Sequence, residues 1–177
     1  MGAALTEGRV DVVVAQVIVR PELQAIVDFS VPARSNVNEV IVSGPGAPAI
    51  ATVDDLAGKE IYVRKDSSAW AALVELNGKL KAKGLAEVAV REVPGNLEDD
   101  DLLEMANAGI IPLTVAQDYL AAFWQQVFTN LTVHESIAVR TGATLAVPFR
   151  KNSPKLAAEI NGFLAKNGLG SALGNMI

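Results

Sequence analysis

The chain has 177 residues, of which 50% are hydrophobic, 20% are charged and only 5% are aromatic. Fifteen Lys and Arg residues against twenty Asp and Glu residues give it a net charge of −5. This hydrophobic content excludes a disordered chain, and the acidic balance argues against nucleic acid as the main partner, because binding to phosphates requires a basic surface. The length fits one compact domain or two small lobes with an aliphatic core.

Residue types that carry chemistry are scarce. The chain has no cysteine, which excludes disulfides, thiolate nucleophiles and cysteine-ligated zinc, and its single histidine is His134. His134-Glu135 lacks the second histidine of a zinc-protease helix, so we expect a surface histidine at a strand end. No carboxylate pair for acid–base catalysis is evident either. We therefore expect a binding protein with no catalytic residue, no metal and no cofactor.

Targeting and membrane signals are also absent from the sequence as it stands. No apolar run reaches the roughly 20 residues that cross a bilayer, and we expect no membrane insertion. The first residues, Met1 to Glu7, lack the cationic and apolar stretches of a signal peptide. A cytoplasmic protein, a removed leader and a fragment of a longer protein all stay open.

The apolar pattern alternates between the period of strands and that of helices, which indicates an α/β fold. The β-branched run Val12 to Ala15 is typical of a strand buried on both faces. The Gly and Pro cluster from Ser43 to Pro48 is the best candidate for a boundary between lobes. The first half as a whole predicts a strand at 12–15, a short helix at 21–27, a strand at 39–42, a capped helical turn at 52–58, a strand at 60–64 and a helix at 68–83.

The second half continues the alternation. We expect Phe123 and Trp124 in the core. The buried face of the last helix is predicted by apolar residues at helical spacing, namely Leu156, Ile160, Phe163 and Leu164. The elements predicted here are a strand at 87–93, an acidic helix capped by Asn96 and ending near Gly109, a strand at 111–116, a helix at 118–128, short strands at 131–133 and 144–149, and a last helix that begins at Ser153-Pro154.

Acidic residues gather at one predicted helix start. The cluster lacks the ligand spacing and the central glycine of a calcium loop. Acidic side chains in a first helical turn complement the helix dipole, so we interpret the cluster as a solvated helix start. Its members are Glu98, Asp99, Asp100, Asp101 and Glu104.

A polar turn, Lys65 to Ser68, follows one predicted strand and opens the next helix. Two hydroxyls with unpaired backbone N–H groups at a helix N-terminus suit a carboxylate or another anion. Plain N-capping is the other interpretation, and the local sequence favours it. Trp70 lies close to this turn and either packs inside or faces a cleft.

Several short motifs follow one another along most of the chain. They are 8–15 (GRVDVVVA), 20–23 (RPEL), 27–30 (VDFS), 44–48 (GPGAP), 54–59 (DDLAGK), 67–68 (SS), 98–105, 123–124 (FW) and 149–154 (FRKNSP). Their order resembles the type II periplasmic solute-binding proteins, in the branch that binds amino acids and related solutes. Within this family the likeness is greatest to the solute-binding-like regulatory lobe of membrane-bound lytic transglycosylases.

The resemblance implies two α/β lobes joined by two crossovers, with the ligand held between them. One lobe would comprise residues 1–45 plus 140–177 and the other residues 46–139, with the Gly and Pro cluster as one crossover. Family members carry a further segment before the Val12 strand, so the first lobe would be incomplete here. Bare strand edges would then be covered by a second copy, which implies a homo-oligomer, namely a dimer.

Ligand contacts of the family are replaced in this sequence. Leu23 stands where an arginine grips the ligand carboxylate, and Ile18 stands where a hydroxyl is usual. Gln117 stands where an aspartate holds the ligand ammonium, with Asp118 next to it. Because leucine cannot form a charge-assisted pair with a carboxylate, the usual amino-acid clamp is dismantled. Arg20 lies near Leu23 and is a candidate substitute.

The resemblance and the residues together predict a non-catalytic solute-binding module for a small polar or anionic ligand. A ligand-free scaffold or regulatory lobe, acting through protein–protein contacts, stays open as the alternative. The resemblance implies a periplasmic location. The expected ligand contacts are Ser67 and Ser68, with Trp70, Arg20, Gln16, Gln117 and Asp118 as further wall residues.

Overall fold

The computed structural model describes residues 2–15, 17–168 and 170–172. The chain falls into two compact units, unit 1 with residues 1–36 and 142–177 and unit 2 with residues 37–141. This division differs from the boundaries expected at 45/46 and 139/140, because strand β3 (Arg34–Ser43) runs on past residue 36 and ends in unit 2. The Gly and Pro cluster is therefore a loop inside unit 2 and not a crossover between units.

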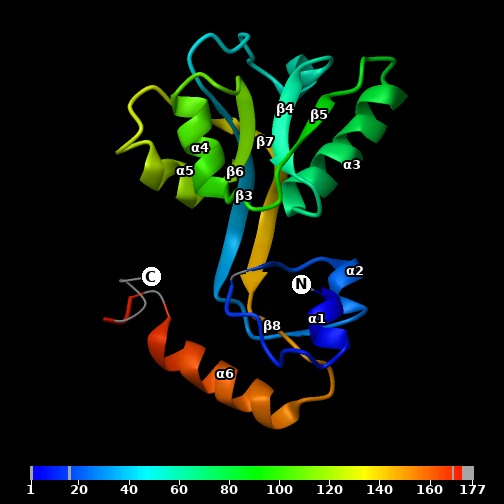
Figure 1. The fold of residues 1–177 in the computed structure, drawn as a ribbon, viewed down its shortest axis with the longest axis vertical. Coiled ribbons are helices and arrows are strands. Elements are labelled where there is room, and N and C mark those ends of the chain that lie inside the picture. Colours follow the sequence, from blue (N-terminus) through cyan, green and yellow to red (C-terminus); the bar gives the residue numbers. More distant parts are fainter. Residues whose placement is uncertain (1, 16, 169, 173–177) are drawn as a thin grey trace. The chain divides into compact units, whose positions relative to one another are not determined.

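Unit 2 is built on a mixed sheet with the strand order β7-β3-β6-β4-β5 (Figure 1). Strand β4 is parallel to both of its neighbours, whereas β3 is antiparallel to β6. Parallel neighbours need crossover connections, and helices supply them here. The further strands are β4 (Glu60–Arg64), β5 (Ala89–Val93), β6 (Leu113–Gln117) and β7 (Thr132–Ala146).

Helices cover both faces of this sheet. Helix α3 (Ser68–Ala82) packs on one face, where Ile41 of β3 and Leu73 of α3 share a core cluster. Helices α4 (Asp99–Asn107) and α5 (Asp118–Trp124) pack on the other face, against Val40 and Val42 of β3. Successive side chains of a strand point to opposite faces, so β3 contributes side chains to both core clusters. Unit 2 therefore has three layers, the sheet and the helices on each of its faces.

Local signals explain several element ends in unit 2. Thr52 and Asp55 form a capping box around the 3-10 helix η1 (Val53–Leu56), as the predicted capped turn requires. Glu98 caps α4, so the prediction of Asn96 as its cap is wrong. A Cβ on Gly44 would lie 1.8 Å from the carbonyl oxygen of Ala106, so only glycine allows this close approach of the loop after β3.

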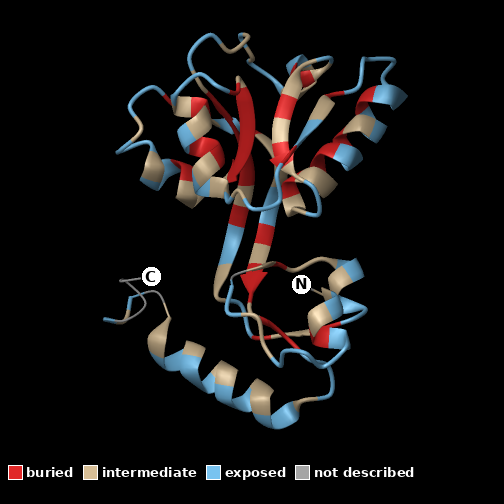
Figure 2. Ribbon diagram, in the orientation of Figure 1, coloured by how far each residue is buried: buried red, intermediate tan, exposed pale blue. Residues whose placement is uncertain are grey.

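Unit 1 has short strands and little core. Strand β1 pairs antiparallel with the end of β7, and β2 pairs antiparallel with β8. Both core clusters of the described residues lie in unit 2, and α6 has no buried residue along its 14 described positions (Figure 2). Its elements are α1 (Gly2–Thr6), β1 (Val17–Ile18), α2 (Pro21–Gln24), β2 (Asp28–Phe29), β8 (Pro148–Phe149) and α6 (Pro154–Asn167).

Three sequence expectations are wrong. The run expected as a buried strand at 12–15 makes only a short contact with β8, an isolated bridge from Val12 to Phe149, and Val14 is 92% exposed. The two short strands expected at 131–133 and 144–149 belong mainly to one long strand, since β7 passes through Gly142 without a break. Phe123 is 58% exposed because it lies on the outer side of α5.

Candidate functional site

One edge of the unit 2 sheet gathers three helix N-termini. Strands β4, β5 and β6 are parallel, and α3, α4 and α5 follow their carboxyl ends (Figure 1). Ligands of open α/β sheets bind at this edge, where loops and helix N-termini meet. Ser67 and Ser68 lie at the start of α3, and Gln117 and Asp118 lie at the start of α5. The fold thus brings four of the predicted contacts to one edge of one unit.

Ser67 is the N-cap of α3. Its Oγ accepts a hydrogen bond from the backbone N–H of Trp70 at 3.0 Å and donates one to the carbonyl oxygen of Arg64 at 2.7 Å. The hydroxyl therefore satisfies one of the first N–H groups of the helix and ties it to the end of β4. The capping interpretation of this turn holds for Ser67.

Ser68 makes a different contact. Its Oγ donates to Oε1 of Glu39 at 2.5 Å, and Nε of Arg140 donates to Oε2 of the same carboxylate at 2.9 Å. Glu39 is only 2% exposed, and burial raises its pKa, while the bonds from Ser68 and Arg140 act in the opposite direction. A buried ion pair thus lies directly beneath the start of α3.

Sequence reasoning missed Glu39 and Arg140. Arg140 also approaches Glu75 of α3, with Nη2 and Oε1 3.6 Å apart. One sequence signal was available: Glu39 is a charged residue at the start of the apolar run of β3. A charge in a buried strand predicts an oppositely charged partner, because a buried charge requires one. The identity of that partner depends on the pairing of β3 with β7, two segments a hundred residues apart.

Asp118 lies on the other side of β3. Its Oδ2 accepts the backbone N–H of Asn38 at 3.1 Å and the Asn38 amide at 2.8 Å, and its Oδ1 accepts the N–H of Tyr119 at 2.8 Å. Asp118 and Gln117 are half-buried, and Gln117 lies opposite Glu39 in the β3–β6 pairing. The carboxylate is held in place and still reaches solvent.

The neighbouring residues frame this edge. Trp70 is half-buried and packs against the core cluster beneath α3, so its ring belongs mainly to the core. Arg64 at the end of β4 pairs with Glu98 at 2.8 Å and with Asp99 at 2.8 Å, both at the start of α4. The acidic helix start is thus partly neutralised by an arginine.

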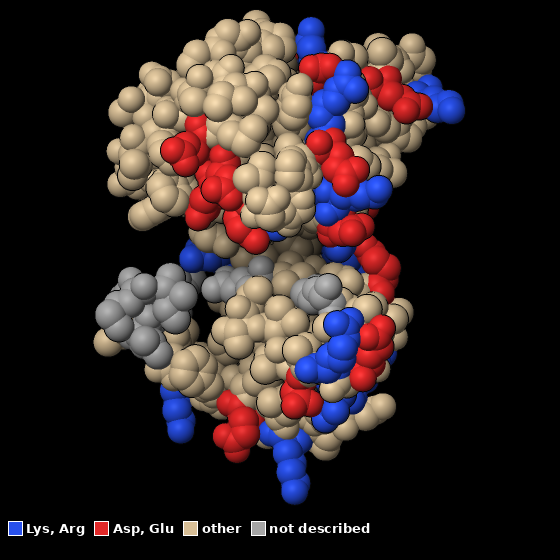
Figure 3. Space-filling model, in the orientation of Figure 1, with Lys and Arg blue, Asp and Glu red and all other residues tan. Residues whose placement is uncertain are grey.

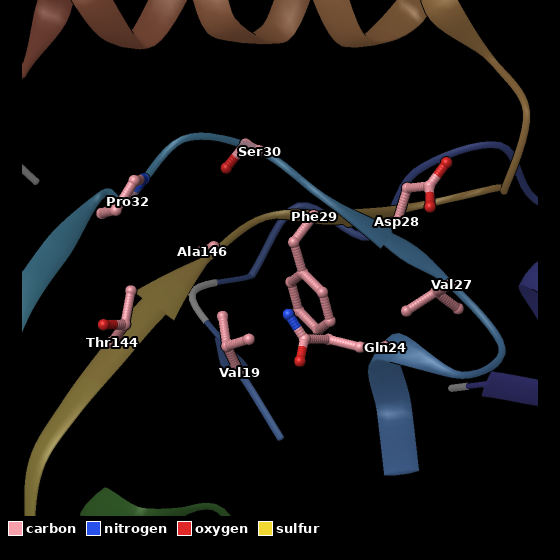
Figure 4. Close-up of a pocket in the computed structure, with 9 residues that line it drawn as sticks. All are labelled: Val19, Gln24, Val27, Asp28, Phe29, Ser30, Pro32, Thr144 and Ala146. Carbon is pink, nitrogen blue, oxygen red and sulfur yellow. The ribbon is translucent and has the colours of Figure 1, made fainter. Parts of the chain in front are cut away.

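The remaining predicted contacts lie in unit 1. Arg20 precedes α2, and its Nη1 is 3.1 Å from Oε1 of Glu22. Gln16 lies outside the described residues. Unit 1 also holds a pocket of about 410 Å³, into which Phe29, Gln24 and Val19 point (Figure 4). None of the six predicted contacts that the structure describes lines this pocket.

No catalytic or metal-binding group emerges from the described part of the chain. His134 is half-buried, its Nε2 lies 2.8 Å from Oγ of Ser43, and burial lowers its pKa. No three His, Cys, Asp or Glu side chains among the described residues are grouped for a metal ion. No described helix has the length and hydrophobicity needed to cross a membrane.

Comparison with known proteins gives one family. The family model of bacterial extracellular solute-binding proteins, family 3, matches residues 1–168. No curated protein matches the chain.

Solved structures share the fold at low identity. An ancestral arginine-binding protein bound to arginine is 22% identical, with a TM-score of 0.72 over 93% of this chain and 68% of that one. The substrate-binding protein AbpA of Streptococcus pneumoniae, bound to L-arginine, is 17% identical, with a TM-score of 0.75 over 93% of this chain and 65% of that one. The chain therefore spans about two thirds of the structures that it matches.

Proposed function

Because the chain belongs to the bacterial extracellular solute-binding proteins of family 3, we propose that it binds a small polar solute at the unit 2 edge where Ser68 and Asp118 lie. The predicted fold class, an α/β fold of the type II periplasmic-binding-protein class, is confirmed. The predicted non-catalytic solute-binding role agrees with this family.

The observation that supports this site is the pairing of opposite polarities at one sheet edge. The first turn of α3 presents backbone N–H groups, which favour an anionic group, and the half-buried Asp118 carboxylate favours a cationic one. A solute with both groups, such as an amino acid, matches this arrangement. Structures similar to this chain hold arginine or glutamine.

The other predicted contacts lie partly in unit 2 and partly in unit 1. Trp70 and Gln117 border the edge in unit 2 and are proposed as walls of the site. Arg20 and Gln16 belong to unit 1, and each stays a prediction that an alanine variant tests separately.

A ligand-free regulatory lobe is the second candidate. The hydroxyls of Ser67 and Ser68 both donate to groups of the protein, which leaves no hydroxyl donor for an anion. Such a lobe would act through protein contacts, as in the lytic transglycosylase lobes that the sequence resembles.

Location and assembly follow as further proposals. The family is extracellular by its description, and we assign this chain to the periplasm on that basis. We also propose a homodimer, because unit 1 has no core cluster among its described residues and leaves apolar side chains exposed.

Isothermal titration calorimetry tests the site directly. The ligands are L-arginine, L-glutamine, dicarboxylic acids and muropeptides, each titrated into the whole chain. We expect saturable binding of at least one, weakened about tenfold or more in Ser68→Ala and Asp118→Asn, since each loses a polar contact. Ser136→Ala, an exposed serine on β7, is the matched control.

The outcomes separate the two candidates. Binding with unchanged affinity in both variants would move the site away from this edge. No binding by any ligand of the panel would favour the regulatory lobe.

A further inference from the structure

Helix α6 carries a face that no other described part of the chain covers. Lys155, Phe163 and Lys166 are exposed on it, and Phe163 keeps 52% of its surface accessible. A Cβ on Gly162 would meet no atom within 4 Å, so the middle of this face is open. Neither lysine makes an ion pair among the described residues. The face thus carries an aromatic side chain, two lysines and one carboxylate, Glu159, and its net charge is positive.

Unit 2 carries a surface of the opposite kind on α4, on α5 and on the turn after α5, which together are called the α4–α5 surface. Phe123 and Val127 are each 58% exposed, and α4 contributes the exposed carboxylates Asp100 and Glu104. Asp100 accepts a hydrogen bond from Nε1 of Trp124 at 2.9 Å, which joins the acidic and the apolar parts. Neither carboxylate has a cationic partner in the described part of the chain. Figure 3 shows acidic side chains gathered over α4 and α5.

The two surfaces complement each other in charge and in polarity. Unit 1 has seven Lys and Arg and five Asp and Glu, which gives +2, whereas unit 2 has eight and fifteen, which gives −7. Basic groups flank the apolar centre on α6, and acidic groups flank the apolar centre on α4 and α5. Complementary charge directs association and fixes its register, and apolar burial stabilises it.

We propose that the outer face of α6 docks on the α4–α5 surface of a second copy of this chain. Every copy carries both surfaces, and in the proposed dimer a two-fold axis relates two equivalent contacts. The contact buries Phe163 of one copy against Phe123 and Val127 of the other. Lys155 and Lys166 then face Asp100 and Glu104.

Charge reversal tests this contact in solution. We compare the oligomeric state of the whole chain by analytical ultracentrifugation, in 50 and 500 mM NaCl. The basic-face variant is Lys155→Glu with Lys166→Glu, and the acidic-face variant is Asp100→Lys with Glu104→Lys. We expect a dimer that is weakened by salt and at least tenfold weaker in each variant.

Rescue and control make the outcome decisive. Combining all four reversals in one chain restores opposite charges and should restore the dimer. Lys79→Glu with Lys81→Glu, two exposed lysines of α3, should leave it unchanged. A monomeric wild-type chain at tens of micromolar overturns the proposal. A dimer that either face variant leaves intact also overturns it, and pairing of two copies through strand edges predicts that result. A combined variant whose dimer is as weak as that of the single-face variants overturns the proposal as well.

Discussion

Ser68 at the start of α3 donates a hydrogen bond to Glu39, a β3 carboxylate that is 2% exposed. The bond ties the proposed binding edge to the interior of unit 2. It also sets the polarity of Ser68, because a hydroxyl that donates inward presents only acceptor lone pairs outward. A solute that contacts this oxygen must therefore bring a hydrogen-bond donor.

Removal of Arg140 should destabilise unit 2. Arg140→Ala leaves the buried Glu39 without its cation, and we expect a loss of about 3 kcal/mol in the free energy of unfolding. Urea unfolding followed by tryptophan fluorescence measures it, since Trp70 and Trp124 both lie in unit 2. Arg91→Ala, which removes an exposed ion pair with Glu60, should cost much less. Equal losses in the two variants would contradict a buried pair.

Glu39 should make stability depend on pH. Burial holds the pKa of Glu39 in the folded chain above the ordinary glutamate value of 4.5, so the folded protein binds more protons than the unfolded chain between these two pKa values. The Glu39 contribution is therefore full below pH 4.5 and is lost as the pH rises through the folded pKa. The stability difference between wild type and Glu39→Gln, measured by urea unfolding from pH 4 to 8, should fall with rising pH. A difference that is constant across this range would exclude a raised pKa.

Ser67 should matter for stability through its cap. Ser67→Ala removes the acceptor for the N–H of Trp70, and we expect a loss of about 1 kcal/mol. Ser67→Asp keeps a capping oxygen and should retain most of the stability. Thermal unfolding compares the three chains. An alanine variant as stable as the aspartate variant would show that the cap is not used.

Two glycines should respond to alanine in opposite ways. Gly44→Ala places a Cβ against the backbone of Ala106, and we expect a loss of about 3 kcal/mol. Gly78 lies inside α3 with open space around it, so Gly78→Ala should stabilise by about 0.5–1 kcal/mol through helix propensity. Midpoints of urea unfolding test both. A tolerated Gly44→Ala would mean that this loop and α4 are not in contact.

The apolar residues of unit 2 alternate between the spacing of strands and that of helices, and this pattern predicts most of its secondary structure elements. Strand β4 was placed at its observed bounds, and α3 within one residue of its end, because strong apolar periodicity and a serine cap are local signals. The Glu39–Arg140 pair was not predictable in this way. It depends on which strands are neighbours, and a sequence alone does not show that β3 lies beside β7.

Unit 1 was harder to predict because its apolar patterns lack partners. The run at Val12 to Ala15 has the composition of a buried strand, yet it makes one bridge and exposes Val14. The helix at Ser153-Pro154 was predicted from its cap and proline, but its apolar face is nowhere fully buried. Local sequence specifies such elements, whereas burial requires a surface to pack against.

The proposed solute site lies at the unit 2 edge formed by the starts of α3 and α5. Its most direct test is a titration of the ¹⁵N-labelled chain with L-arginine and L-glutamine, followed by amide chemical shifts. We expect saturable shifts centred on the amides of Ser68, Ala69, Asp118 and Tyr119. Saturable shifts confined to other parts of the chain, or no shifts with either amino acid or with the remaining solutes of the panel, would contradict it.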